Sequence, residues 1–388
     1  MPMQNSASLT RRKFMQTTAA GLASAMPAMA NAAIRPRQNL PTSPVAIGRC
    51  RRYDFEQVKI VLGDLFDQIG GVRAMMNGKS VSVKINTTSY QAAGIYTLPN
   101  TLTVFTHPIV TLAACSLFED YGARRVIICE SHPTRDETRT AFVKQTYDVS
   151  LFESVLQHVE FENTRNLGTG SRYTTLPVGE GAYLYTAFDL NHRYVDTDVM
   201  VSIAKMKNHD IAGITLSMKN MFGITPNSLY GESGNENATA IRDRVLHNGT
   251  LSPGVSGEIQ PVISHDAGFR VPRIVTDIVR ARPIDLAIID AIVSMHGGEG
   301  AWNGLQTGIT VPNLLIAGKN CVCTDAVTAA VMGYDPEAED WSKPFVNCSN
   351  ILRLAADRGL GTNRLSEIDV GGVSIQDARY DYLPGLIR

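Results

Sequence analysis

The sequence predicts an α/β three-layer sandwich with a mostly parallel or mixed central sheet. Six short runs are apolar almost throughout, as in strands that helices cover on both faces. Helical stretches separate these runs, and such alternation is typical of a sheet built from strand–helix units. The 388 residues are 44% hydrophobic and 19% charged, which suits a large buried core and excludes a disordered chain.

The elements follow one another without an internal repeat or a low-complexity tract, so we predict a single domain over residues 33–388. Pro108 suits the first turn of a helix, and Gly122 and Gly359 suit helix ends. The predicted strands are residues 45–47, 81–85, 126–128, 199–203, 286–289 and 314–317. The predicted helices are residues 55–68, 108–121, 151–157, 272–280, 325–332 and 350–358.

Residues 225–270 interrupt this alternation. The segment is rich in Gly, Asn, Ser and Pro, and only residues 238–246 have a helical pattern. Loops longer than about fifteen residues are uncommon in compact domains and are often lids or binding loops. Tyr230, Val262 and Phe269 give the segment apolar anchors. We therefore predict an ordered, lid-like insertion over a site, with a disordered insertion as the alternative.

The first 32 residues predict an export signal. Arg11 and Arg12 precede Phe14 and an apolar stretch rich in Ala, and small residues in an Ala-x-Ala pattern follow. We expect a twin-arginine signal peptide, with the export machinery as a partner and a periplasmic or secreted mature protein. Residues 17–26 are too few to span a bilayer, which takes about twenty residues. We therefore expect a soluble mature protein without stable membrane insertion.

Charge and cysteine content exclude several classes of protein. Lys plus Arg number 36 and Asp plus Glu 37, so nothing indicates a nucleic-acid partner. The cysteine spacings match neither a zinc site nor an iron–sulfur cluster, and we expect structural roles for the thiols. The sequence also lacks the H-E-x-x-H, G-x-S-x-G and EF-hand patterns. The cysteines are Cys50, Cys115, Cys129, Cys321, Cys323 and Cys348.

The most informative segment follows the strand at residues 199–203. If the extended geometry continues, Lys205, Lys207 and His209 share one face at the carboxyl end of this strand. Ligands bind at this end of the strands in open α/β sheets. Burying two lysines side by side is costly, and a bound anion or nearby carboxylates would offset the cost. In the alternative, the strand ends at Ala204 and the lysines are solvated.

Other predicted strands also end in polar side chains. Lys84 and Asn86 follow one strand, Glu130 and His132 follow the next, and Asp290 ends another. If these strands are neighbours in a parallel sheet, their carboxyl ends form a rim of charged groups. The recurrence favours a ligand site at this edge.

Residues 213–223 predict a short helix that a glycine ends. On such a helix Thr215 and Lys219 would share a face, and the free backbone N–H groups at its start would suit an anion. A solvated amphipathic helix is the alternative interpretation.

Glu299 stands among three glycines in residues 297–300, which would let the backbone approach a ligand closely, although a plain turn is also consistent with this segment. Asp325 stands at the start of a predicted helix, where capping is the default role.

Several of these segments occur in the same order in one known family. The matching residues are Lys84, Asn86, His107, Pro108, Gly122, Lys205, Lys207, His209, Thr215, Lys219, Asn220, Gly223, Asp290, residues 297–300, Thr324 and Asp325. On these residues the chain resembles the family catalogued as domain of unknown function 362, with Lys205, Lys207 and His209 in the place of its K-x-K-x-H. Many members carry a ferredoxin-like cysteine cluster that this sequence lacks, so the resemblance implies a site rather than a role in electron transfer.

These observations lead to one site hypothesis, a pocket for a small carboxylate or phosphate. We expect His209 and Glu299 to form an acid/base pair. A divalent cation bound by Asp290, Glu299 and Asp325 is a further expectation. The alternatives are a non-catalytic anion- or metal-binding accessory protein, or a redox-associated protein whose cofactor belongs to another subunit. The expected substrate-binding residues are Lys84, Asn86, Lys205, Lys207, Thr215, Lys219, Asn220, Gly297 and Gly298.

Overall fold

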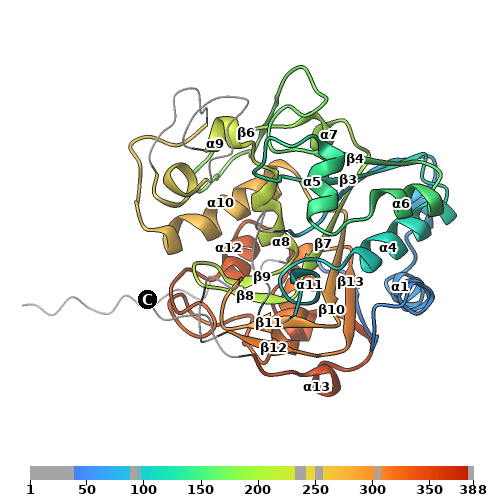
Figure 1. The fold of residues 1–388 in the computed structure, drawn as a ribbon. Helices are drawn as coiled ribbons and strands as arrows, with labels where there is room; N and C mark the ends of the chain where they lie inside the picture. Colours follow the sequence, from blue (N-terminus) through green and yellow to red (C-terminus); the bar gives the residue numbers. More distant parts are fainter. Residues whose placement is uncertain are drawn as a thin grey trace, which may run out of the picture. The chain divides into compact units, whose positions relative to one another are not determined.

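A mixed sheet with the strand order β14-β1-β13-β10-β7-β2-β3-β4 runs through the fold (Figure 1). β13 is antiparallel to both of its neighbours, whereas the other pairings in this sheet are parallel. The predicted, mostly parallel sheet is therefore confirmed. The strands are β1 (Val45–Arg49), β2 (Ser80–Lys84), β3 (Arg125–Glu130), β4 (Val159–Asn163), β7 (Val199–Lys205), β10 (Leu286–Ala291), β13 (Leu314–Gly318) and β14 (Val370–Gly372).

The structure is a computed structural model that describes residues 39–87, 95, 98–231, 242–249, 257–300, 303 and 307–382. The expected signal peptide at residues 1–32 lies outside the described residues, as do parts of the expected lid. In the described part of the chain, no helix is long and apolar enough to cross a bilayer.

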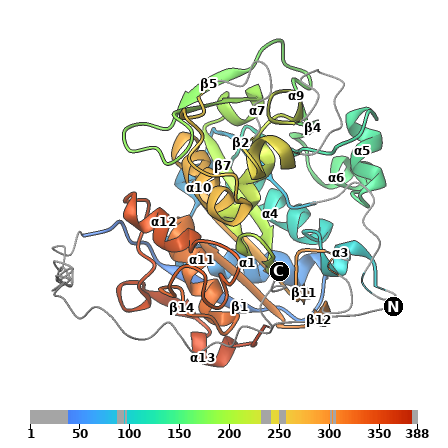
Figure 2. The same cartoon turned by 90° about the vertical axis from the view of Figure 1, so that its left-hand side faces the viewer.

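Helices cover both faces of the sheet (Figure 2). Side chains alternate along β3, so Val126 and Ile128 pack on one face while Ile127 and Cys129 pack on the other. The three-layer architecture follows from this alternation. On the first face lie α1 (Phe55–Gln68), α4 (Pro108–Asp120), α5 (Thr138–Lys144) and α6 (Val149–Val155). On the second face lie α8 (Ser217–Asn220), α10 (Ala267–Ala281), α11 (Cys321–Val331) and α12 (Ile351–Asp357).

Short elements connect these layers. The strands among them are β5 (Thr174–Pro177), β6 (Ala187–Leu190), β8 (Lys207–His209), β9 (Gly213–Thr215), β11 (Ser294–His296) and β12 (Gly308–Thr310). The helices among them are α2 (Arg73–Met76), α3 (Asn100–Thr103), α7 (His192–Val195), η1 (Met221–Ile224), α9 (Asn227–Tyr230), η2 (Asp243–His247), η4 (Leu365–Glu367) and α13 (Ile375–Ala378).

The expectation that a helix begins at Pro272 is wrong, because α10 begins at Ala267 and includes this proline. Asp266 caps the helix by accepting a hydrogen bond from the Phe269 amide at 2.8 Å. A proline inside a helix leaves the carbonyl four residues earlier without its usual donor. Here the Ser349 amide donates to that carbonyl, of Gly268, at 3.1 Å, so a long-range contact supplies what the proline removes.

The segment 213–223 also differs from its prediction. Its first part is β9, which pairs with β8 in a hairpin that places Thr215 opposite Lys207. The helix α8 begins only at Ser217, so Thr215 and Lys219 do not share a helix face.

The six cysteines, all in the described residues, are free and buried, and burial raises the pKa of each thiol.

Candidate functional site

Charged side chains from four neighbouring parallel strands meet at the carboxyl edge of the sheet. Lys84 ends β2, Glu130 ends β3, Lys205 ends β7, and Asp290 is opposite Lys205 on β10. They separate into two groups. We call Tyr53, His107, Lys205 and Asp290 the inner network, and Lys84, Glu130, Lys207, His209, Asp210, Lys219, Arg242 and Glu299 the charged cluster.

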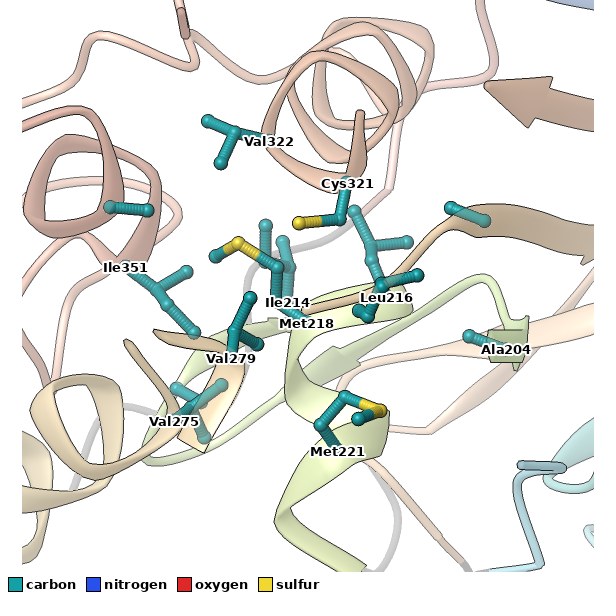
Figure 3. Packing of buried hydrophobic residues seen from close by; sticks show 14 of the residues in the cluster. Ala204, Ile214, Leu216, Met218, Met221, Val275, Val279, Cys321, Val322 and Ile351 are labelled. Atoms are coloured by element: carbon teal, nitrogen blue, oxygen red, sulfur yellow. The ribbon is translucent and has the colours of Figure 1, made fainter. Parts of the chain in front are cut away.

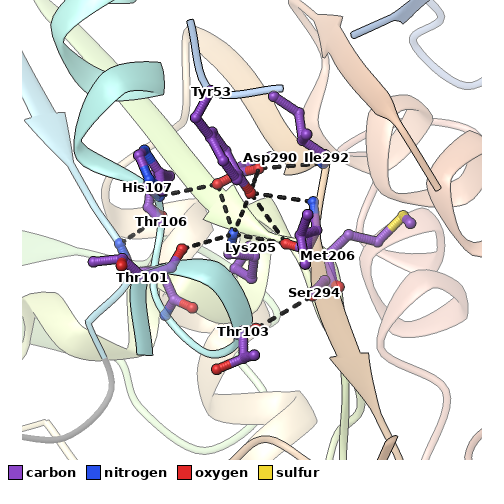
Figure 4. Close-up of polar contacts among 12 residues, drawn as sticks. Tyr53, Thr101, Thr103, Thr106, His107, Lys205, Met206, Asp290, Ile292 and Ser294 are labelled. Carbon is purple, nitrogen blue, oxygen red and sulfur yellow. Dashed lines mark hydrogen bonds and ion pairs between the residues drawn. The ribbon is translucent and has the colours of Figure 1, made fainter. Parts of the chain in front are cut away.

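The inner network is saturated with hydrogen bonds (Figure 4). The ammonium of Lys205 lies 2.8 Å from the Asp290 carboxylate and 3.0 Å from the Tyr53 hydroxyl, and both charged side chains are fully buried. The Lys205 ammonium also donates to the backbone carbonyls of Val293 and Thr101, at 2.9 and 3.4 Å.

The carboxylate of Asp290 also has several hydrogen-bond partners. It accepts hydrogen bonds from the Tyr53 hydroxyl and from the His107 backbone amide, each at 2.9 Å. The His107 ring stacks on Tyr53 with ring centroids 3.7 Å apart. Lys205 and Asp290 therefore hold β7, β10 and the start of α4 together. Both side chains are thus engaged within the protein, and the roles of Lys205 in substrate binding and of Asp290 in metal binding stay predictions.

Lys84 is a buried residue of the charged cluster. Its ammonium lies 2.7 Å from Glu130 and donates to the Asn220 side chain at 3.2 Å. Asn220 in turn donates to the Lys84 carbonyl at 3.0 Å. A Cβ at Gly223 would lie 2.9 Å from the Lys84 Cε, so the absent side chain lets η1 pass over this ion pair. Lys84 and Asn220 thus fix α8 to the end of β2.

The β8–β9 hairpin carries Lys207 and His209. The buried Lys207 ammonium donates to the carbonyls of Val104 and Glu299, at 3.0 and 2.9 Å. Burial lowers the pKa of Lys207 to about 7. Thr215, on the opposite strand, donates to the Asn208 carbonyl at 3.3 Å and so closes the hairpin.

Asn208 connects this hairpin to the glycine-rich loop. Its side-chain oxygen accepts from the Gly297 amide at 3.1 Å, and its amide nitrogen donates to Tyr334 at 2.6 Å. Gly298 has a φ of 154°, and a Cβ there would lie 2.3 Å from Asn303. The Asn303 oxygen accepts from the Glu299 amide at 3.0 Å, so Asn303 holds Glu299 in place.

His209, Asp210 and Glu299 form a group that could hold a metal ion, with one ligand atom from each within 4.8 Å of the others. His209 Nδ1 lies 3.3 Å from an Asp210 oxygen and 4.0 Å from a Glu299 oxygen. Sequence reasoning missed Asp210, although it directly follows His209. The structure brings His209 and Glu299 together, and their role as an acid/base pair stays a prediction.

The expected metal ligands Asp290, Glu299 and Asp325 do not form such a group in the described part of the chain. Asp325 is not the cap of its own helix, because Asn320 caps α11. Its carboxylate instead accepts from the Ser217 hydroxyl at 2.6 Å and from the Ser217 and Met218 amides, each at 2.9 Å. Burial raises the pKa of Asp325 to about 7. An internal carboxylate therefore occupies the helix start that was expected to bind an anion.

Lys219 differs from the other lysines of the cluster. The core holds α8 through Leu216, Met218 and Met221, which pack against α10 and α11 (Figure 3). Lys219 lies between these anchors and is only partly buried. Within the described residues its ammonium makes no hydrogen bond or ion pair, and its close partner is the Phe222 ring, 4.6 Å from the ring centroid. Within the described residues the Lys219 ammonium thus has no hydrogen-bond acceptor.

The charges around Lys219 belong to the same cluster. Burial lowers its pKa to about 8, Glu299 and Asp210 oppose this shift, and Arg242 and Lys84 reinforce it. Arg242 comes from the predicted insertion and donates to Ser131 and to the Thr225 carbonyl. Sequence reasoning missed this arginine, because it lies within a segment of weak periodicity.

The described residues of the predicted insertion contact the core, and its role as a lid stays a prediction. Arg270 of α10 is fully buried and donates to the Leu246 carbonyl at 3.0 Å, which ties η2 to the core. The same arginine forms an ion pair with Glu258 at 2.6 Å. Through these contacts the insertion carries Arg242 to the cluster.

Two solved structures are similar to parts of the chain at low sequence identity. A structural-genomics crystal structure of a Thermotoga maritima protein is 15% identical, with a TM-score of 0.34 over 63% of this chain and 51% of that one. The lactate racemase apoprotein from Thermoanaerobacterium thermosaccharolyticum is 14% identical, with a TM-score of 0.35 over 69% and 54%. The chain spans about half the length of these two proteins.

No protein with a curated description matches the sequence. The model of one family, described as domain of unknown function (DUF362), matches residues 81–330. These residues run from β2 to the end of α11 and include nearly all of the charged side chains described above. The chain therefore belongs to the DUF362 family.

Proposed function

We propose that this protein is an enzyme that acts on a small carboxylate or phosphate anion at the charged cluster. The observation that carries the proposal is the partly buried ammonium of Lys219, which has no hydrogen-bond acceptor within the described residues. Withdrawing an ammonium from water without an acceptor is costly, and a bound anion supplies the missing acceptor. In the inner network the protein supplies Lys205 with hydrogen-bond acceptors. It supplies none to Lys219 within the described residues, and this difference favours a ligand at Lys219.

Proton transfer would involve His209 and Glu299. In this proposal Nε2 is the reacting nitrogen of His209, because Nδ1 already lies 3.2 Å from the Ile211 amide and 3.3 Å from an Asp210 carboxylate oxygen. Nε2 can then donate a proton to a substrate while the Glu299 carboxylate accepts one. A Glu299 carboxylate oxygen lies 4.0 Å from Nδ1 of the same ring, so the two side chains adjoin each other.

Binding and turnover test the proposal separately. Isothermal titration with acetate and with inorganic phosphate should show binding that Lys219→Met weakens and that Lys59→Met does not. Lys59 on α1 is the control, because its ammonium also lies over a ring, that of Phe55, but already has an ion pair with Asp120 at 2.7 Å. Absence of binding of both anions to the unmodified protein would contradict the proposal.

The catalytic roles are tested with Glu299→Gln, compared with Glu339→Gln on the exposed surface. A screen of carboxylates and phosphate esters in deuterated water would detect turnover by exchange or by product formation. Glu299→Gln should abolish turnover and leave affinity nearly unchanged, because the amide keeps the shape but cannot accept the proton. An anion-binding protein without turnover would favour the accessory-protein alternative.

A second candidate is metal-assisted chemistry, favoured by the group of His209, Asp210 and Glu299. One imidazole and two carboxylates suit a divalent first-row transition metal, which would polarise a substrate oxygen. Elemental analysis and titration with Mn²⁺ test this, with His209→Ala expected to abolish binding. His192→Ala is the control, because Glu162 and Asp196 approach different nitrogens of that ring and cannot share an ion with it. Equal Mn²⁺ binding by both variants would contradict the metal site.

We also propose that the protein is exported. Arg11 and Arg12 suit a twin-arginine signal that delivers the folded protein to the periplasm or the exterior. Replacement of both arginines by lysine should retain the protein in the cytoplasmic fraction. Unchanged export of that variant would rule out the twin-arginine route.

A further inference from the structure

The side-chain amide of Asn86 lacks hydrogen bonds at the edge of the sheet. Asn86 is only 5% exposed, and its Oδ1 is buried without a partner. Its Nδ2 also makes no hydrogen bond within the described residues. Buried amides are paired in the great majority of native structures, because an unpaired one loses its bonds to water without replacement. The buried side-chain atom of Asn86 thus has no partner among the described residues.

The backbone around Asn86, in contrast, is firmly fixed. Its amide donates to the Thr106 hydroxyl at 3.1 Å, and its carbonyl accepts from the Thr106 amide at 2.9 Å. The Thr106 hydroxyl donates to the Ile203 carbonyl at 2.8 Å, and Asn220 approaches the same carbonyl at 3.5 Å. Through Thr106 and one carbonyl on β7, the backbone of Asn86 is linked to the side chain of Asn220, which follows Lys219 in the sequence. The Asn86 amide and the Lys219 ammonium, which both lack partners among the described residues, therefore belong to the same edge of the sheet.

The chemistry of the amide indicates the group that it recognises. No protein partner fixes which end of the amide carries the oxygen, so the buried atom requires either a donor or an acceptor. A hydroxyl group is both, and it satisfies the amide in either orientation. An anion that carries a hydroxyl would bind Lys219 with its charge and Asn86 with its hydroxyl.

We infer that the substrate is a small hydroxy acid or hydroxyalkyl phosphate, and that Asn86 is the residue that selects for its hydroxyl group. This inference rests on the proposed anion site at Lys219. It adds a specificity that the lysine alone lacks, because an ammonium binds hydroxylated and plain anions alike.

Two matched pairs of probes test the inference by isothermal titration, glycolate against acetate and 2-hydroxyethyl phosphate against ethyl phosphate. The members of each pair differ only by a hydroxyl group. The unmodified protein should bind the hydroxylated member of at least one pair about tenfold more tightly. The pair that shows the preference also distinguishes a carboxylate from a phosphate substrate.

Asn86→Leu should reduce this preference to less than about twofold and leave the affinity for the plain member unchanged. Lys219→Met should weaken both members equally. Asn227→Leu is the matched control, because the Asn227 side chain is also a buried amide without hydrogen bonds, but on α9. It should leave the preference intact.

The outcomes separate the two proposals. Equal binding of both members of each pair, or a preference that survives Asn86→Leu, would overturn the role of Asn86 and leave the anion site in place. Absence of binding of all four probes would overturn the anion site and this inference with it. Thermal unfolding provides the check on folding, and Asn86→Leu should melt no lower than the unmodified protein, because it removes an unsatisfied amide.

Discussion

Lys205 and Lys219 stand at the same edge of the sheet and have opposite surroundings. Lys205 is fully buried among Asp290, Tyr53 and two backbone carbonyls. Lys219 is partly buried and has an aromatic ring as its close partner. The comparison teaches that a lysine at a strand end is not by itself a ligand site. What distinguishes a candidate binding group is an ammonium that the protein leaves without an acceptor.

The largest expected effect comes from breaking the saturated lysine. Lys205→Met leaves the Asp290 carboxylate buried without its ion pair, which we expect to lower the free energy of unfolding by about 3–5 kcal/mol. Urea denaturation measures the change. The double variant Lys205→Met, Asp290→Leu should recover most of the loss, since both charges are then absent. A single variant as stable as the unmodified protein would show that the inner network is not structural.

Lys219→Met provides the opposite case. We expect its free energy of unfolding to change by less than about 1 kcal/mol, because no hydrogen bond of Lys219 is lost. The affinity for acetate or phosphate should fall at least about tenfold, as expected for loss of a charge-assisted contact. Parallel urea and titration experiments test both parts. A variant that loses stability but keeps its affinity would reverse the assignments of the two lysines.

The pH dependence of binding sharpens the same comparison. Burial lowers the pKa of Lys219 to about 8, so its ammonium is charged below pH 8 and loses its proton above it. The affinity for acetate should therefore decline as the pH rises through 8, because the neutral amine no longer attracts the anion. Lys219→Arg should keep its affinity across this range, since a guanidinium stays charged. An unchanged pH profile in that variant would assign the titration to another group.

The smallest expected effect concerns the buried ion pair of Lys84 and Glu130 in the charged cluster. A Cβ at Gly223 would lie 2.9 Å from Lys84 Cε and 3.5 Å from a Glu130 oxygen. Gly223→Ala should shift this ion pair and lower the free energy of unfolding by about 1 kcal/mol. Gly63→Ala on α1 is the control, because the nearest atom there is 4.0 Å away, and it should be neutral or stabilising. Calorimetry of both variants would reveal whether the close approach at Gly223 matters.

The strand–helix order was predictable because it depends on local patterns. The helix α1 has the predicted bounds, and its buried Val58, Leu62, Leu65 and Phe66 follow the helical period. The bounds of α10 were not predictable, because a distant amide, from Ser349, satisfies the carbonyl that Pro272 frees. For a related reason the structure brings together His209, Asp210 and Glu299 rather than the three expected metal ligands. Asp325 is bonded to a helix start more than 100 residues away in the sequence, and no local pattern records that contact.

By itself the sequence determined the three-layer α/β architecture, the charged edge of the sheet and the pairing of His209 with Glu299 as candidates. Hydrophobic period and strand order are properties of short segments, so they can be derived without coordinates. Only the tertiary structure decided which charges neutralise one another. Asp290 reaches Lys205 across 85 residues of chain, whereas no described acceptor reaches Lys219. Electrostatic attraction depends on distance in space, and the fold alone sets that distance.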